Sequence, residues 1–308
     1  MNTRRAFTLV EILAVVAIIG ILVTLVAVAV KGAMDAAKRA RIAVQMSQTA
    51  MALDRHKAEF GEHPPDMFDD EALLSYVRKR WPRFNVQDPE TVRGAITSAY
   101  THAYGRADVI FSPVGSLALW LGGFPDPDGK LSGFYADPEN PFTPTGTFDQ
   151  KTFLDLEIGE NKSVQLFPLD SNATVFVPVI ASVIRDVPVP IVYFRGRSSG
   201  GNNAYRYGPV DENGIRPFVK YFDFSDWGLG LCVPYADDGD TESGIVAKWH
   251  NPSTYQLIHP GLDGVFGEPP EDPMRPHRVT KTGENIGLYD LDNLTNFSDY
   301  KELKSILP

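Results

Sequence analysis

The sequence predicts an α+β protein in which a long N-terminal α-helix packs on a C-terminal antiparallel sheet. Residues 12–30 are uncharged and mostly apolar, and apolar residues continue at helical spacing, without proline, as far as Phe60. All 24 prolines lie beyond Gly61, where helix-like segments come first and strand-like segments follow. The helix is therefore expected to have a transmembrane half and an amphipathic half, with a large mixed insertion before the last strands.

The first half of the helix has the length of a membrane span. The 19 residues Ile12–Val30, at about 1.5 Å each, approach the roughly 30 Å of a bilayer core. One alternative is a buried helix of a soluble protein, which the terminal position behind Arg4 and Arg5 disfavours. Another is a cleaved signal peptide with its cleavage site at Ala27–Ala29. Both the length of the run and Glu11 oppose it, because a carboxylate in hydrocarbon is costly unless paired or protonated.

The second half of the helix is predicted to be amphipathic. Between Lys31 and Phe60 there is no proline, and basic residues alternate with apolar ones at helical spacing. Residues 7–60 would form a rod of roughly 80 Å. Gly61 and the following His-Pro-Pro-Asp are expected to end it.

The remaining chain alternates regular segments with long turns. Capping residues and periodicity predict helices at 70–80, 89–104 and 112–123. Residues 124–149 form a turn-rich loop with many Pro, Gly and Asp residues. Strands are predicted within 173–184, 188–195, 220–224 and 254–260.

Charge and composition exclude several classes of function. The 308 residues include 29 basic and 39 acidic side chains, for a net charge of −10, which argues against a nucleic-acid partner. The single cysteine, Cys232, forms no disulfide within the chain and is expected to be buried. The six histidines form no metal-binding motif, and no nucleophile elbow is present. We therefore expect a protein that is not an enzyme.

The N-terminal stretch RRAFTLVEILAVVAIIGIL resembles that of the type IV pilin and type II secretion pseudopilin superfamily. The resemblance implies that a prepilin peptidase cuts between Ala6 and Phe7 and that the new N-terminal Phe7 is methylated. The family usually has glycine before the cut. Because Ala6 is also small, we expect cleavage to occur here, at a lower rate.

The same resemblance gives Glu11 a role, since it becomes the fifth mature residue. It implies that this carboxylate meets the α-amine of a neighbouring subunit, and two buried opposite charges satisfy each other where either alone is costly. It also implies a single-pass inner-membrane protein with a periplasmic C-terminal domain. Basic residues at the two ends of the span do not by themselves favour this orientation.

The C-terminal segment resembles the end of the major pseudopilins of type II secretion. There, a Gly-x-Asp-Gly turn and an aspartate-rich loop bind calcium together. The matching positions are Asp263 in GLDG, and Asp290 and Asp292 in YDLDN. Calcium takes six to eight oxygen ligands, so carboxylates from two loops would suit it. The alternative is a pair of solvated turns held by aspartate side chains.

These inferences predict a pseudopilin that assembles into a periplasmic pseudopilus for protein export. Its partners would be other copies of itself, prepilin peptidase, other pseudopilins, the inner-membrane secretion platform and membrane lipid. The alternatives are a type IV pilus subunit and a signal-anchored periplasmic binding domain or enzyme. The predicted parts are a leader (1–6), a membrane span (7–30), an amphipathic helix (31–61), an α+β insertion (62–245) and a C-terminal region with the calcium-like loop (246–308).

Overall fold

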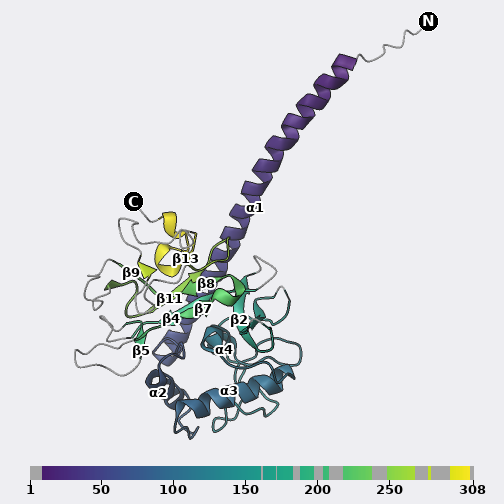
Figure 1. Cartoon of the computed structure of the whole chain (residues 1–308). Coiled ribbons are helices and arrows are strands. Elements are labelled where there is room, and N and C mark those ends of the chain that lie inside the picture. Colours follow the sequence, from purple (N-terminus) through teal and green to yellow (C-terminus); the bar gives the residue numbers. More distant parts are fainter. Residues whose placement is uncertain are drawn as a thin grey trace. The chain divides into compact units, whose positions relative to one another are not determined.

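A computed structural model shows the fold of the chain (Figure 1). It describes residues 9–160, 162–170, 172–182, 188–197, 204–207, 218–237, 248–267, 277–278 and 292–305. The chain divides into two compact units, Met1–Ile42 and Ala43–Pro308.

The longest element is helix α1, which runs from Leu9 to Phe60 and contributes to both units. It ends where the sequence predicts. Gly61 has φ +82°, a left-handed conformation that suits glycine, and its N–H donates to the carbonyl of Lys57 at 2.7 Å. Within the second unit, one side of the helix is buried at Met46, Leu53 and His56. This part of the helix is amphipathic, as predicted.

The described residues of the second unit form three further α-helices: α2 (Asp70–Arg80), α3 (Pro89–Tyr104) and α4 (Ser116–Gly122). The side chains of Asp69 and Asp88 cap α2 and α3 by accepting from backbone N–H groups in the first turn. The helix predicted at 112–123 begins instead as the 3₁₀ helix η1 (Pro113–Gly115), and Ser112 makes no capping hydrogen bond. In Figure 1, α2 and α3 lie at the end of this unit away from strand β13.

Two antiparallel three-stranded sheets form the largest β-structure. Their orders are β1-β2-β3 and β13-β11-β4. In the second sheet, Ile258 pairs with Val192 on one side and with Thr295 on the other. The strands are β1 (Val164–Pro168), β2 (Phe176–Ser182), β3 (Val189–Pro190), β4 (Val192–Arg195), β11 (Tyr255–His259) and β13 (Leu294–Thr295). The predicted α+β class is therefore confirmed.

Shorter pairings complete the described structure. Strands β5 and β6 pair with each other, as do β7 and β8, and β9 pairs antiparallel with β10 and parallel with β12. The strands are β5 (Arg206–Tyr207), β6 (Phe218–Val219), β7 (Phe222–Phe224), β8 (Gly230–Cys232), β9 (Tyr235–Asp237), β10 (Lys248–Trp249) and β12 (His277–Arg278). The 3₁₀ helices η3 (Ser225–Trp227), η5 (Asn296–Ser298) and η6 (Leu303–Ser305) lie between or after them.

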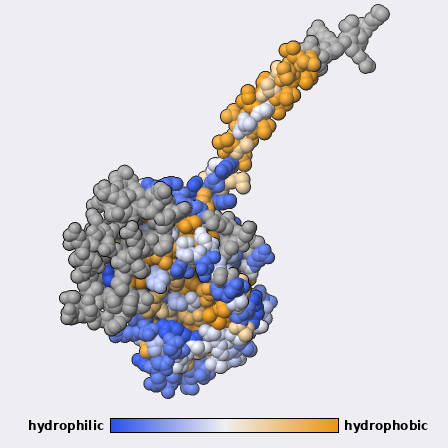
Figure 2. Space-filling view, in the orientation of Figure 1, coloured by the Kyte–Doolittle hydropathy of each residue, from blue (hydrophilic) through white to orange (hydrophobic). Residues whose placement is uncertain are grey.

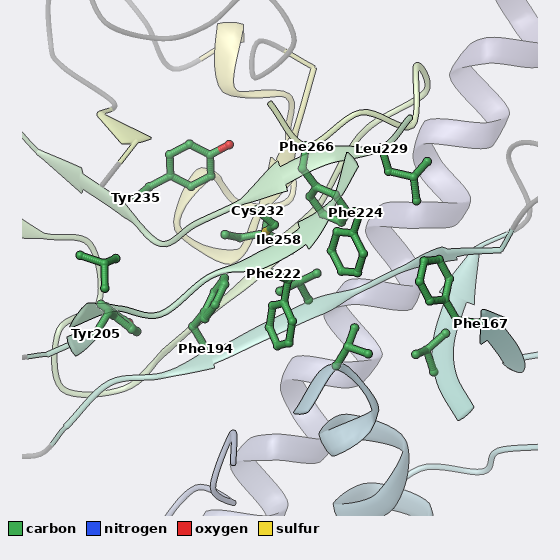
Figure 3. Packing of buried hydrophobic residues seen from close by; sticks show 14 of the residues in the cluster. Phe167, Phe194, Tyr205, Phe222, Phe224, Leu229, Cys232, Tyr235, Ile258 and Phe266 are labelled. Carbon is green, nitrogen blue, oxygen red and sulfur yellow. The ribbon is translucent and has the colours of Figure 1, made fainter. Parts of the chain in front are cut away.

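Two hydrophobic clusters lie among the described residues of the second unit. One lies among the helices and the turn-rich loop and includes Tyr76 and Trp120. The other lies among the strands, where Phe222, Phe224 and Phe266 stand close together (Figure 3). Cys232 is buried in this cluster, as predicted. Such close-packed clusters hold their backbone in one arrangement, which positions the polar groups around them.

Candidate functional site

The apolar start of α1 is the first candidate site. Large apolar side chains between Leu9 and Val30 are 49–82% exposed, and Figure 2 shows this part of the helix coloured as hydrophobic. By length and composition, α1 is the one described helix able to cross a membrane. An aliphatic surface of this extent is far larger than the patches that soluble monomers usually expose. It therefore needs an apolar surrounding, such as lipid or other helices.

The predicted processing and assembly residues lie at the beginning of this segment. Glu11 occupies the first turn of α1 and is exposed. A carboxylate there is also favourably placed in the dipole of the helix, whose N-terminus is electropositive. Ala6 and Phe7 lie outside the described residues. Their predicted cleavage and methylation stay predictions.

The predicted C-terminal site is a turn in which two separate segments meet. The Asp292 Oδ2 atom accepts hydrogen bonds from the backbone N–H groups of Leu262 and Asp263, at 3.0 and 3.2 Å. The Asp263 Oδ1 atom accepts from the N–H of Val265 at 2.8 Å. Gly261, with φ +70°, permits this approach, since a Cβ there would lie 2.3 Å from the Asp292 carbonyl oxygen. The structure thus brings together two of the three predicted aspartates.

This turn has part of what a calcium ion needs. The hydrogen bonds that the structure describes at the Asp292 carboxylate both reach its Oδ2 atom. The third predicted ligand, Asp290, lies outside the described residues. Among the residues that the structure describes, no three metal-binding side chains lie close enough together to hold an ion. The two aspartates suit an oxygen-seeking cation, and calcium binding stays a prediction.

A buried charge cluster follows the end of α1, and it was not predicted from the sequence. The Lys220 Nζ atom lies 2.6 Å from Asp66 Oδ2, and both side chains are only 2% exposed. Lys220 also donates to the Arg195 carbonyl at 2.7 Å, while the Arg195 N–H donates to Asp66 Oδ2 at 2.8 Å. Burial lowers the pKa of Lys220, and the Asp66 carboxylate opposes that effect. The pair joins the chain after the helix to strand β4.

Two more ion pairs surround this cluster. Arg195 Nη2 contacts Glu62 Oε2 at 2.8 Å, and Arg197 pairs with Asp69, the residue that caps α2. A cavity of about 260 Å³ adjoins them, lined by Asp66, Asp69, Ala72, Arg195, Gly196, Arg197 and Lys220. Three basic and two acidic side chains line this cavity, and each acidic one is paired with a basic one.

A buried histidine lies beside the end of the helix. His56 Nδ1 lies 3.2 Å from the Glu62 carbonyl, which can only accept, so Nδ1 carries the proton. His56 Nε2 then accepts from the Tyr76 hydroxyl at 2.7 Å, and the Tyr76 oxygen accepts from Arg80 Nη1 at 2.9 Å. Burial is the main cause that lowers the pKa of His56 to about 3, and Arg80 adds to it. This chain of hydrogen bonds requires a neutral histidine.

Comparison with known proteins bears on the N-terminal segment. Residues 1–27 match the family model described as the prokaryotic N-terminal methylation motif. The match covers Ala6, Phe7 and Glu11 and supports a prepilin-like subunit of the type IV pilin and pseudopilin superfamily. It implies processing by prepilin peptidase and assembly with other pilin-like subunits. The comparisons with curated proteins and with solved structures found no significant match.

Proposed function

We propose that the chain is a structural subunit of a membrane-associated filament, assembled through the N-terminal half of α1. The observation that carries this proposal is the coincidence of the methylation motif at 1–27 with an exposed, uncharged helical segment. After removal of residues 1–6, Phe7 is the mature N-terminus. The filament buries the apolar surface that a single subunit exposes, which favours assembly by the hydrophobic effect and by close helix packing.

The first test is the chemistry of the mature N-terminus. When the chain is expressed together with an active prepilin peptidase, mass spectrometry is expected to find methylated Phe7 as its first residue. An Ala6→Gly variant, which restores the residue usual in the family, should be processed faster. An intact Met1, or a cut after Ala29, would contradict the proposal in favour of a simple anchor or a signal peptide.

The second test concerns Glu11. Its carboxylate would pair with the Phe7 amine of a neighbouring subunit, so Glu11→Ala should abolish filament assembly while leaving processing and insertion intact. Glu11→Asp keeps the charge and should retain part of the assembly. Asp35→Ala, which removes an acidic residue beyond the apolar run, serves as the matched control. If Glu11→Ala assembled at the normal level, the pair of Glu11 with the Phe7 amine would not set the axial register between neighbouring subunits.

Within this class, we favour a periplasmic pseudopilus of type II secretion, anchored in the inner membrane with the second unit in the periplasm. The support is the turn at 261–264, where Asp263 and Asp292 meet at the positions that the resemblance predicts. Deletion of the gene should stop export of the secreted proteins and leave surface pili intact. Loss of pili with normal secretion would favour the alternative, a type IV pilus subunit.

We also propose that this turn binds calcium. Asp263, Asp290 and Asp292 would supply carboxylate oxygens, and the ion would stabilise the folded state relative to the unfolded state. Addition of calcium should therefore raise the melting temperature of the purified chain, and a chelator should reverse the rise. Asp292→Asn should abolish the calcium-dependent part, whereas Asp126→Asn, in a turn of the 124–149 loop, should not. An identical melting temperature with and without calcium would contradict the site.

A further inference from the structure

The charges of the chain are divided unevenly between its two units. Residues 1–42 contain six basic and two acidic side chains, which leaves 23 basic and 37 acidic ones for the rest of the chain. Four of the six basic residues fall within 31–41, where Asp35 is the single acidic residue. A concentrated positive charge therefore follows the apolar run directly, in a chain that is otherwise acidic.

Three of these residues share one face of α1. Successive helix positions differ by about 100°, so Lys31, Lys38 and Arg41 fall within an arc of about 80°. All three side chains are exposed, and none makes an ion pair or hydrogen bond with another residue that the structure describes. Met34 lies on the same face and is 56% exposed. We call Lys31, Lys38 and Arg41 the basic stripe.

The stripe begins where the apolar run ends. Ile12–Val30 is long enough to fill the hydrocarbon layer, so Lys31 is placed at its boundary. Lys38 follows about 10 Å and Arg41 about 15 Å farther along the helix axis. Side chains of a helix lean toward its N-terminus, so these long basic side chains reach back toward the membrane surface. Both positions lie within about two Debye lengths of that surface at physiological salt, about 16 Å.

We propose that the basic stripe binds the headgroups of anionic phospholipids in the leaflet where the apolar run ends. Each basic residue close to a negatively charged leaflet gains about 1 kcal/mol, which corresponds to roughly a fivefold preference. The exposed Met34 and the aliphatic stems of the lysines provide apolar surface next to the charges, as expected at a membrane interface. This inference rests on the membrane-anchored placement of α1 and does not depend on filament assembly.

The competing occupant is an acidic surface on a second copy of the chain. Its second unit is acidic enough to offer one. The position of the stripe favours lipid, because Lys31 follows the last uncharged residue directly and every anchored copy meets the headgroup layer there. A protein partner would bind the stripe equally well in vesicles that contain no anionic lipid, so lipid composition separates the two.

The test measures lipid selectivity of the full chain reconstituted as single subunits in vesicles. Electron paramagnetic resonance compares the association of spin-labelled phosphatidylglycerol and spin-labelled phosphatidylcholine with the protein. We expect phosphatidylglycerol to be preferred by about fivefold at low salt, the effect of one basic residue at the surface. About 1 M salt should remove most of the preference, because the Debye length falls to about 3 Å.

A charge-removing variant identifies the residues responsible. The ratio of phosphatidylglycerol to phosphatidylcholine association should fall to nearly one in the triple variant Lys31→Gln/Lys38→Gln/Arg41→Gln. It should be unchanged in the charge-conserving variant Lys31→Arg/Lys38→Arg/Arg41→Lys. The matched control, Arg55→Gln/Arg83→Gln/Lys301→Gln, removes three exposed basic residues of the second unit and should also keep it.

Two results would overturn the proposal: equal association of both lipids with the unmodified chain, or a preference that survives the loss of the stripe. Either result leaves the filament proposal untouched, because the subunits in this assay are not assembled. Conversely, normal assembly of Glu11→Ala would contradict the register proposal without changing the lipid result.

Discussion

The two halves of helix α1 carry similar apolar residues in very different surroundings. Leu25, in the first half, is 63% exposed, whereas Leu53, in the second half, is fully buried. Other residues of the second unit cover one side of the second half, as in the hydrogen bonds from Gln45 to the Ala181 carbonyl and from the Ser182 hydroxyl to Gln45. The pattern of apolar residues therefore shows that a helix surface must be buried. It does not show which groups bury that surface.

The largest expected effect comes from shortening one leucine in each half. Leu53→Ala creates a cavity in a packed site and should lower the free energy of unfolding by about 3 kcal/mol. Leu25→Ala removes the same atoms from an exposed position and should leave the unfolding midpoint unchanged. Urea unfolding of the full chain in mild detergent, followed by tryptophan fluorescence, measures both. Equal shifts of the unfolding midpoint in the two variants would show that Leu25 and Leu53 are buried to the same extent.

The next largest effect concerns the charges that follow the second half. Asp66→Asn leaves the Lys220 ammonium buried without a counter-charge and should cost about 3 kcal/mol of unfolding free energy. Adding Lys220→Met to the same chain should restore most of that loss, since it removes the unpaired charge. The double variant is measured by the same urea titration. If the changes in unfolding free energy of the two single variants add up to that of the double variant, Asp66 and Lys220 do not stabilise each other.

A further effect is expected from pH. The pKa of His56 is about 3 in the folded chain and near 6.5 when unfolded, so the unfolded state binds the proton more readily below pH 6.5. This contribution to stability is complete above pH 6.5 and decreases by about 1.4 kcal/mol per pH unit as the pH falls. His259, whose burial also lowers its pKa to about 3, acts in the same direction.

The His56→Gln variant isolates the contribution of that histidine. It should reduce the dependence of the unfolding free energy on pH between about 6.5 and 4.5 by removing the contribution of His56, while burial still lowers the pKa of His63 and of His259. Free energies of unfolding from urea titrations at several pH values test this. A slope equal to that of the unmodified chain would mean that His56 is charged in the folded state.

The smallest expected effect is at the end of the helix. Gly61→Ala places a Cβ on a residue with φ +82° and should cost about 1 kcal/mol. The control is Gly94→Ala in the interior of α3, where an added Cβ meets open space. It should stabilise by about 0.5–1 kcal/mol, because alanine is the better helix former. Thermal melting distinguishes the two by opposite signs.

Local structure was partly predictable, because the helices and several strands were predicted whereas strands such as β1 and β8 were not. The ends of α2 and α3, the stop of α1 at Gly61 and the strands that include β2, β4, β7 and β11 follow from caps, glycine and alternation. Such signals act over a few residues, so they are visible in the sequence. The start of α4 was predicted less well, because Ser112 and Pro113 begin a 3₁₀ turn before the α-helix.

Long-range pairings were not predictable. Lys220 lies 154 residues from Asp66, and in the run FVKYFDF it looks like an exposed position of a strand. The pairing of β4 with β11 likewise joins segments that no local pattern connects. The meeting of Asp263 with Asp292 was anticipated through a resemblance rather than through any rule of chain geometry.

Three properties could be read from the sequence alone: α1 is long, its first half is uncharged apart from Glu11, and residues 1–27 match a methylation motif. These properties depend on neighbouring residues along one helix. Two others become visible in the folded chain: which side of the second half is covered, and the neutralisation of Lys220 by Asp66. Both depend on groups brought together by folding, whose energies arise from burial and are absent in the extended chain.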